Sequence, residues 1–148
     1  MAFRRLPCDP HGQRIRQNRD PRYFDFLGFT HYWGRSRLKN WVVKRKTARD
    51  RLTRALRHIN VWCRDNRHAK LRWQQAQLNK KIQGHYAYYG VTSNFKALAG
   101  FFYYVKRIWR RWLCRRSQKG WINWDRFLLL LERYPLLPPS IVRTATGP

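Results

Sequence analysis

Apolar residues recur at helical spacing between residues 95 and 112, and this pattern constrains the fold more than any other. They follow one another at steps of three or four residues: Phe95, Leu98, Phe102, Val105, Trp109 and Trp112. Such steps place side chains on one face of an α-helix, because the helix turns once about every 3.6 residues. The pattern predicts a long amphipathic helix over residues 95–117, with Asn94 as its N-cap.

Two more amphipathic helices are expected before this one. The first covers residues 48–66, where Thr47 is positioned as the N-cap and Asp50 completes a capping box. The second covers residues 70–89, and Gly84 in its interior indicates a close approach by a neighbouring helix, because glycine otherwise weakens a helix.

A short fourth helix is expected after residue 122, with Asn123 as its N-cap. Its apolar face would consist of Trp124, Phe127, Leu128 and Leu131. Prolines from residue 135 onward end this helix. Residues 138–148 are then expected to form an extended or loose tail.

The segment before the helices is rich in aromatic and β-branched residues, which favour strands. Tyr23–Trp33 is predicted to form one strand and Trp41–Lys46 a second, so that residues 23–46 make a short β-hairpin. Residues 1–22 carry six arginines without apolar periodicity and are expected to be an irregular basic arm. The expected fold class is mainly α: a three- to four-helix bundle preceded by a short β-hairpin.

Positive charge is concentrated on the expected helices. The chain has 33 Lys and Arg against 7 Asp and Glu, a formal net charge of +26, yet 43% of its residues are hydrophobic. Eighteen of the basic residues, with only two acids, lie between residues 47 and 119. A solvated helix face normally mixes both signs, so this excess favours a folded surface that binds a polyanion, with RNA or DNA as the leading candidates.

Catalytic and metal-binding residues are poorly represented. The seven carboxylates are scattered, whereas Mg²⁺-dependent phosphoryl transfer needs them in clusters. The three cysteines form no Cys-x-x-Cys pair, and His58, Cys63 and His68 are spaced unfavourably for a shared ion on a helix. We therefore expect no catalytic residue, no metal and no cofactor.

Membrane insertion is not expected either. The longest stretch without a Lys, Arg, Asp or Glu, Ile82–Phe95, is too short to span a bilayer. A cytoplasmic protein without a membrane partner is the expected class.

Short motifs in a fixed order resemble those of group II intron-encoded reverse transcriptases. Phe24–Phe29 resembles the last conserved block of the polymerase palm in that family. Gly84–Gly90, followed by Asn94, resembles the signature of its maturase domain, also called the thumb or X domain. Later elements of that domain are similar to Leu113–Ser117, Trp124 and Tyr134–Pro138. The order and spacing of the motifs make the resemblance, which covers about residues 21–143, specific.

The resemblance implies a thumb-like helical module that binds RNA. Proteins of this family bind their own intron RNA and help it reach its splicing-active form. Full-length members also copy RNA into DNA, with the thumb holding the template–primer duplex. The chain lacks the Tyr-x-Asp-Asp motif, the fingers, most of the palm and the zinc-dependent endonuclease of some relatives. It is therefore expected to be a maturase-specific domain over residues 47–137, preceded by the end of the palm, and not itself an RNA-directed DNA polymerase.

The expected mechanism is binding, through cations that neutralise RNA phosphates. The candidate RNA contacts are Arg107, Arg110, Arg111, Arg115, Arg116, Lys80, Lys81, Arg51, Arg54 and Tyr88. Group II intron RNA is the expected partner. Two alternatives remain open. The chain could be a non-functional remnant of a mobile element. It could also be the thumb piece of a split reverse transcriptase, in which case the palm would be a separate chain and both chains would bind the template–primer duplex.

Overall fold

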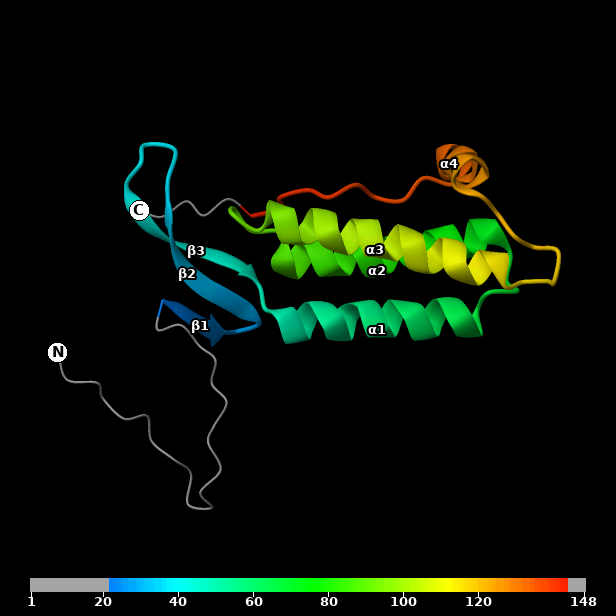
Figure 1. Ribbon diagram of the computed structural model, residues 1–148, viewed down its shortest axis with the longest axis horizontal. Coiled ribbons are helices and arrows are strands. Elements are labelled where there is room, and N and C mark those ends of the chain that lie inside the picture. The colour runs from blue at the N-terminus through cyan, green and yellow to red at the C-terminus, as the bar shows by residue number, and fades with distance from the viewer. Residues whose placement is uncertain (1–21, 144–148) are drawn as a thin grey trace, which may run out of the picture.

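A computed structural model describes residues 22–143, which form a three-stranded antiparallel sheet followed by four helices (Figure 1). The elements are β1 (Tyr23–Phe26), β2 (Phe29–Arg35), β3 (Trp41–Thr47), α1 (Arg49–Asp65), α2 (Leu71–Tyr89), α3 (Phe95–Cys114) and α4 (Trp124–Arg133). The predicted fold class, mainly α with strands at the N-terminal side, is confirmed. Residues 1–21 of the expected basic arm and 144–148 of the expected tail lie outside the described residues.

The segment predicted as one strand, residues 23–33, is two strands joined by a tight turn. Leu27 and Gly28 adopt φ angles of 50° and 80°, and Phe26 pairs with Phe29 across the turn. Positive φ at both positions is typical of the two-residue hairpin turns that match strand twist. A Cβ on Gly28 would lie 3.1 Å from the hydroxyl of Tyr89, a tight contact, but the positive φ angle is the main reason for glycine at this position. The predicted hairpin is therefore a three-stranded meander.

The sheet is fixed to the first turn of α1 and to the end of α2. The Ala48 amide donates to the Gly28 carbonyl at 2.9 Å, and the Tyr88 hydroxyl donates to the Leu27 carbonyl at 2.8 Å. The buried ring of Phe29 stacks on Tyr88, with ring centroids 5.8 Å apart. The β1–β2 turn is thus held against the helices.

Of two predicted helix caps, Thr47 is wrong in position and Asn94 is right in position but makes no cap hydrogen bond, because the two side chains bond to each other instead. Ala48, not Thr47, occupies the N-cap of α1, and no side-chain cap hydrogen bond forms there. Asn94 occupies the N-cap of α3, but its amide oxygen accepts from the Thr47 amide at 2.7 Å and its Nδ2 donates to the Thr47 hydroxyl at 2.9 Å. Both residues are buried, so the pair joins the end of the sheet to the start of α3.

The core lies among α1, α2 and α3, with α4 crossing the end of the bundle that lies away from the sheet (Figure 1). Trp109 is its largest fully buried side chain, and its ring meets Phe127 of α4 edge-on. The indole Nε1 donates to the buried Gln74 side chain at 2.9 Å, and Gln74 in turn donates to the carbonyls of Arg67 and Ala69. The buried polar groups of Trp109 and Gln74 are therefore paired with each other and with backbone carbonyls, as burial requires.

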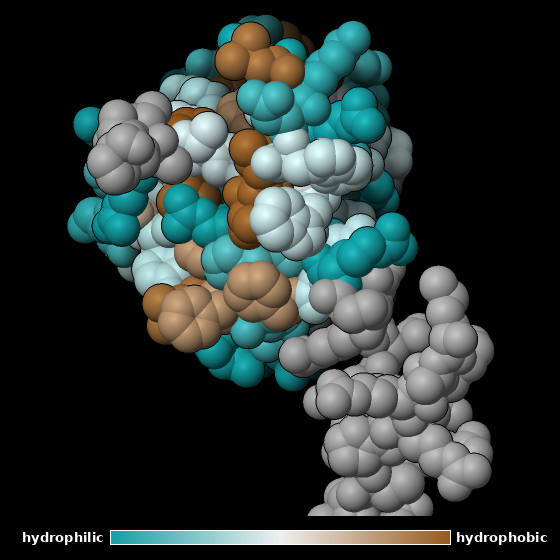
Figure 2. Space-filling model, turned by 90° about the vertical axis from the view of Figure 1, so that its left-hand side faces the viewer, coloured by the Kyte–Doolittle hydropathy of each residue, from teal (hydrophilic) through white to brown (hydrophobic). Residues whose placement is uncertain are grey.

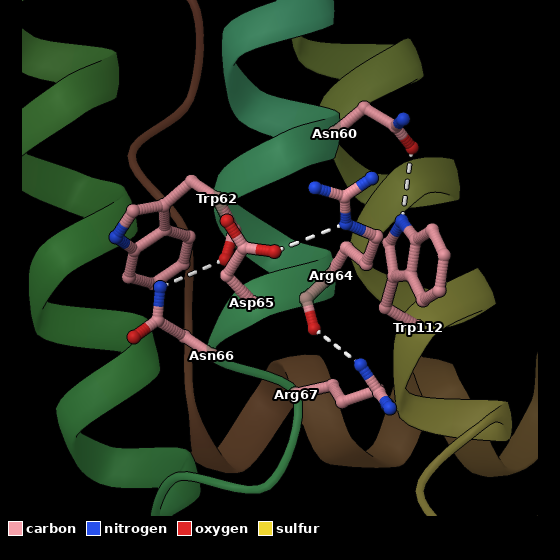
Figure 3. Close-up of polar contacts among 7 residues, drawn as sticks. All are labelled: Asn60, Trp62, Arg64, Asp65, Asn66, Arg67 and Trp112. Carbon is pink, nitrogen blue, oxygen red and sulfur yellow. Dashed lines mark hydrogen bonds and ion pairs between the residues drawn. The ribbon is translucent and has the colours of Figure 1, made fainter.

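Two arginines, Arg64 in the last turn of α1 and Arg67 just after the helix, make local contacts (Figure 3). Arg64 pairs with Asp65 at 3.0 Å, and Arg67 donates to the Arg64 carbonyl at 2.8 Å. Trp112 of α3 donates its indole N–H to Asn60 at 2.9 Å, which ties α3 to α1. These arginines stabilise the end of the helix and are less available to a ligand.

Three details of the predicted helices differ in the structure. Gly84 is exposed, and a Cβ built on it would meet nothing within 4 Å, so the expected close helix contact is wrong. Helix α3 ends at Cys114 instead of residue 117. On α4, Phe127 is buried but Leu128 is 52% exposed, because this short helix contacts the core through one narrow stripe.

The tail is not loose over residues 138–143. After α4 the chain runs back along the bundle toward the sheet (Figure 1). Gln75 and Asn79 of α2 donate to the Pro135 carbonyl, and the Gly90 carbonyl accepts from the amides of Val142 and Arg143 at 2.8 Å each. Side chains of α2 therefore hold the start of this segment, and the Gly90 carbonyl holds its end at residues 142 and 143.

Acidification is expected to weaken the bundle through His85. Its ring stacks on Phe101 at 3.8 Å, and burial lowers its pKa to about 4 from 6.5. Because the unfolded chain binds the proton more readily between these values, stability falls as the pH drops through about 6.5 toward 4. Circular-dichroism melting should give a Tm about 5 °C or more lower near pH 4.5 than near pH 7. His85→Phe keeps the stack and should reduce this difference; an undiminished difference would refute the assignment to His85.

Candidate nucleic-acid interface

A basic hollow of about 900 Å³ lies between the β1–β2 turn and the first half of α1. Its arginines are Arg49, Arg51, Arg54 and Arg57. Two acids, Asp25 and Asp50, also line it, and Asp50 approaches Arg51 at 3.9 Å. The arginines exceed the acids by two, so the hollow keeps a net positive charge and suits an anionic ligand.

A second, smaller hollow of about 360 Å³ lies at the C-terminal end of α3. Its basic residues are Arg107, Arg110, Arg111 and Arg115, and its other walls are Cys114, Trp121 and Trp124. Steps of three, one and four residues bring the four guanidinium groups to one side of the helix. The apolar stripe on the opposite side of α3, with Val105, Trp109 and Leu113 buried, fixes the direction in which they face.

No carboxylate within residues 22–143 forms an ion pair with these four arginines. Their neighbours are aromatic: the Arg110 guanidinium lies 4.8 Å from the Trp124 ring centroid and 5.8 Å from that of Trp121. Arg115 lies over Trp112 at 5.1 Å, and Arg107 donates to the Tyr103 hydroxyl at 2.7 Å. Aromatic faces hold arginine side chains in place without neutralising them, so the charge remains available to a ligand.

The loop between α3 and α4 is held in a defined shape. The Cys114 sulfur accepts from the Ile122 amide at 3.3 Å, and the Gly120 amide donates to the Ser117 carbonyl at 3.1 Å. A Cβ on Gly120 would come within 3.0 Å of the Ser117 hydroxyl, so a larger residue would crowd this turn. The turn places Trp121 beside Arg110, with 68% of its surface exposed.

The remaining predicted contacts do not join either hollow. The Arg116 guanidinium donates to the carbonyls of Ala69 and His68, at 3.2 and 3.5 Å, and so packs against the α1–α2 loop. Tyr88 is used to hold the β1–β2 turn. Lys81 lies 5.5 Å from the Trp62 ring centroid, and Lys80 is exposed on α2. The structure thus groups Arg51 with Arg54 in the first hollow, and the four α3 arginines in the second.

Sequence reasoning missed Arg49, Arg57, Trp121 and Trp124 as parts of these hollows. The two arginines belong to the same basic face of α1 as Arg51 and Arg54, so their spacing carried a signal. Trp121 follows Gly120 in a polar loop and fits no apolar periodicity. Single exposed apolar side chains are common, so Trp121 gives no signal in the sequence and becomes a candidate only through its place beside Arg110.

Metal and thiolate chemistry find no support in the described part of the chain. Residues 22–143 contain no group of three or more His, Cys, Asp or Glu side chains arranged to hold a metal ion. Burial raises the pKa of the Cys63 thiol to about 12, which keeps it protonated at neutral pH.

Among residues 22–143, none of the helices combines the length and the apolar character that crossing a bilayer requires.

Comparisons of the chain with protein-family models, with curated proteins and with solved structures find no match. The two basic hollows and the aromatic side chains around them are therefore the features that bear on function.

Proposed function

We propose that this chain is an RNA-binding maturase domain, which binds group II intron RNA and assists its folding and splicing without copying RNA itself. The observation that supports the proposal best is the presence of two arginine-lined hollows, one beside the first half of α1 and one at the C-terminal end of α3. These two helix ends lie at opposite ends of the bundle (Figure 1). The 20 residues of α3 correspond to about 30 Å of helix. A ligand that bridges both hollows must carry negative charge over a comparable length, as a folded nucleic acid does.

RNA is favoured over duplex DNA by the aromatic residues near the arginines. Trp121, Tyr103 and Tyr104 are 68%, 48% and 49% exposed, although large aromatic side chains are usually covered in a folded protein. Aromatic side chains bind nucleic acids by stacking on unpaired bases, which folded RNA presents in loops and bulges. A continuous DNA duplex keeps its bases stacked on one another, so it would satisfy the arginines but not the aromatic rings.

The thumb of a split reverse transcriptase is the second candidate function. Phe24, Phe26 and Trp41 of the sheet are 54%, 61% and 64% exposed, and the sheet end of the molecule mixes apolar with hydrophilic surface (Figure 2). A palm on a separate chain would cover such a surface and supply the missing carboxylates. Co-purification with a palm chain, together with polymerase activity that needs both chains, would favour this candidate over the free RNA binder.

A splicing assay tests the maturase proposal. Transcripts that contain a group II intron from the same genome are incubated at a Mg²⁺ concentration where the RNA alone splices slowly. The protein is expected to raise the splicing rate about tenfold or more, which corresponds to a barrier lowered by about 1.4 kcal/mol. An unchanged rate for every intron tried, at protein concentrations that saturate the RNA, would contradict the proposal.

A further inference from the structure

The hollow at the end of α3 has three properties that phosphate binding alone does not explain. Its outer wall is Trp121, an indole that is more than two-thirds exposed yet held on a loop fixed by hydrogen bonds. Its volume, about 360 Å³, is at the lower end of the range found for small-molecule sites, roughly 300–1,000 Å³. A space of this size accepts one nucleotide, whereas a duplex can only lie across its mouth.

The third property is an unsatisfied donor. The Nε of Arg110 is buried and has no hydrogen-bond partner among the described residues. A buried donor without an acceptor is unfavourable, so a small movement of the Arg110 side chain that turns Nε toward an acceptor of a ligand would be favoured. Phosphate oxygens and the carbonyl groups of bases are acceptors of this kind, and arginine binds both.

We propose that this hollow receives a single unpaired nucleotide of a bound RNA, such as a bulged residue. The base stacks on Trp121, and the phosphate is neutralised by Arg110 with its neighbours Arg107 and Arg111. The inference rests on the proposed RNA-binding function and adds to it the RNA feature that is recognised. A paired base cannot take this place, because both of its faces are covered by neighbouring base pairs.

The test compares two RNA duplexes of identical sequence, each annealed from two strands so that no loop is present; one is fully paired and the other has a single bulged adenosine. Binding is measured by fluorescence anisotropy at about 0.15 M salt. Wild-type protein should bind the bulged duplex about 5- to 100-fold more tightly, the contribution expected of one base–aromatic stack. Trp121→Ala should lose this preference and bind the two duplexes equally.

Trp41→Ala is the matched control. Trp41 is 64% exposed and has the guanidinium of Arg35 at 5.2 Å from its ring, but it lies on β3, away from the hollow. This variant should keep the preference for the bulge. Because both tryptophans are exposed, both variants should melt within a few degrees of the wild-type protein, which shows that the fold is intact.

The possible results are distinct. Equal affinity of the wild-type protein for both duplexes, or an equal preference for the bulge in Trp121→Ala, would overturn the nucleotide site and leave the proposed function standing. Failure of the wild-type protein to bind either duplex would overturn the proposed function and this inference with it.

Discussion

Replacing Trp109 with alanine is expected to destabilise the protein by about 3–5 kcal/mol, the usual cost of truncating a buried tryptophan. The Trp109 side chain is fully buried, meets Phe127 edge-on at 6.0 Å and donates to Gln74 at 2.9 Å. The variant leaves a large cavity and removes the donor that pairs with the buried Gln74 oxygen. Because +26 of net charge already opposes compaction, a loss of this size should leave much of the protein unfolded at low salt.

Urea denaturation followed by circular dichroism, in about 0.2 M salt, measures this effect. With a denaturant slope of about 1–3 kcal/mol per M, the midpoint should fall by at least about 1 M. Trp41→Ala removes an equally large but mostly exposed side chain, so its effect should stay within about 0.5 kcal/mol. Similar losses in the two variants would show that the core is not organised around Trp109.

Removing the four arginines of the α3 hollow is expected to give the largest loss of RNA affinity. The variant carries Arg107→Ala, Arg110→Ala, Arg111→Ala and Arg115→Ala. If all four neutralise phosphates, the slope of log affinity against log salt should become shallower by about 3, and the affinity at about 0.1 M salt should fall about 10²–10³-fold. Arg116 is not included, because its guanidinium already binds two carbonyl groups of the protein.

The matched control removes the same amount of charge elsewhere on the helices. Arg72, Lys96, Arg126 and Arg133 are exposed on helices α2, α3 and α4 and line neither hollow. Their replacement by alanine should change the salt slope by less than about 1. Equal losses in the two variants would mean that RNA binding depends on net charge alone and not on a defined surface.

The long helices were predictable from the sequence because their packing is local and periodic. Helix α3 begins at Phe95, as its apolar spacing predicts, and only its last turn was placed wrongly. The turn at Leu27 and Gly28 was missed because the aromatic alternation continues through it, and leucine rarely adopts a positive φ. The bond between Thr47 and Asn94 joins residues 47 positions apart, and each residue alone is also a good helix cap.

The charged residues of the candidate site could be predicted from the sequence, but its aromatic residues could not. Arg107, Arg110, Arg111 and Arg115 follow from the basic run on α3, and the structure brings them together. The sequence could not separate Arg116 from them, because the carbonyl groups that it binds belong to a distant loop. Trp121 was missed because its place beside Arg110 depends on the fold of the α3–α4 loop, which no periodicity describes.

The most direct test of RNA binding is a competition between two nucleic acids. Group II intron RNA and duplex DNA of equal length are titrated in parallel with the wild-type protein, in a mobility-shift assay at about 0.15 M salt. The account predicts at least about tenfold tighter binding to the RNA, because its unpaired bases add stacking to the phosphate contacts that both ligands share. Equal affinity for the two ligands would contradict it.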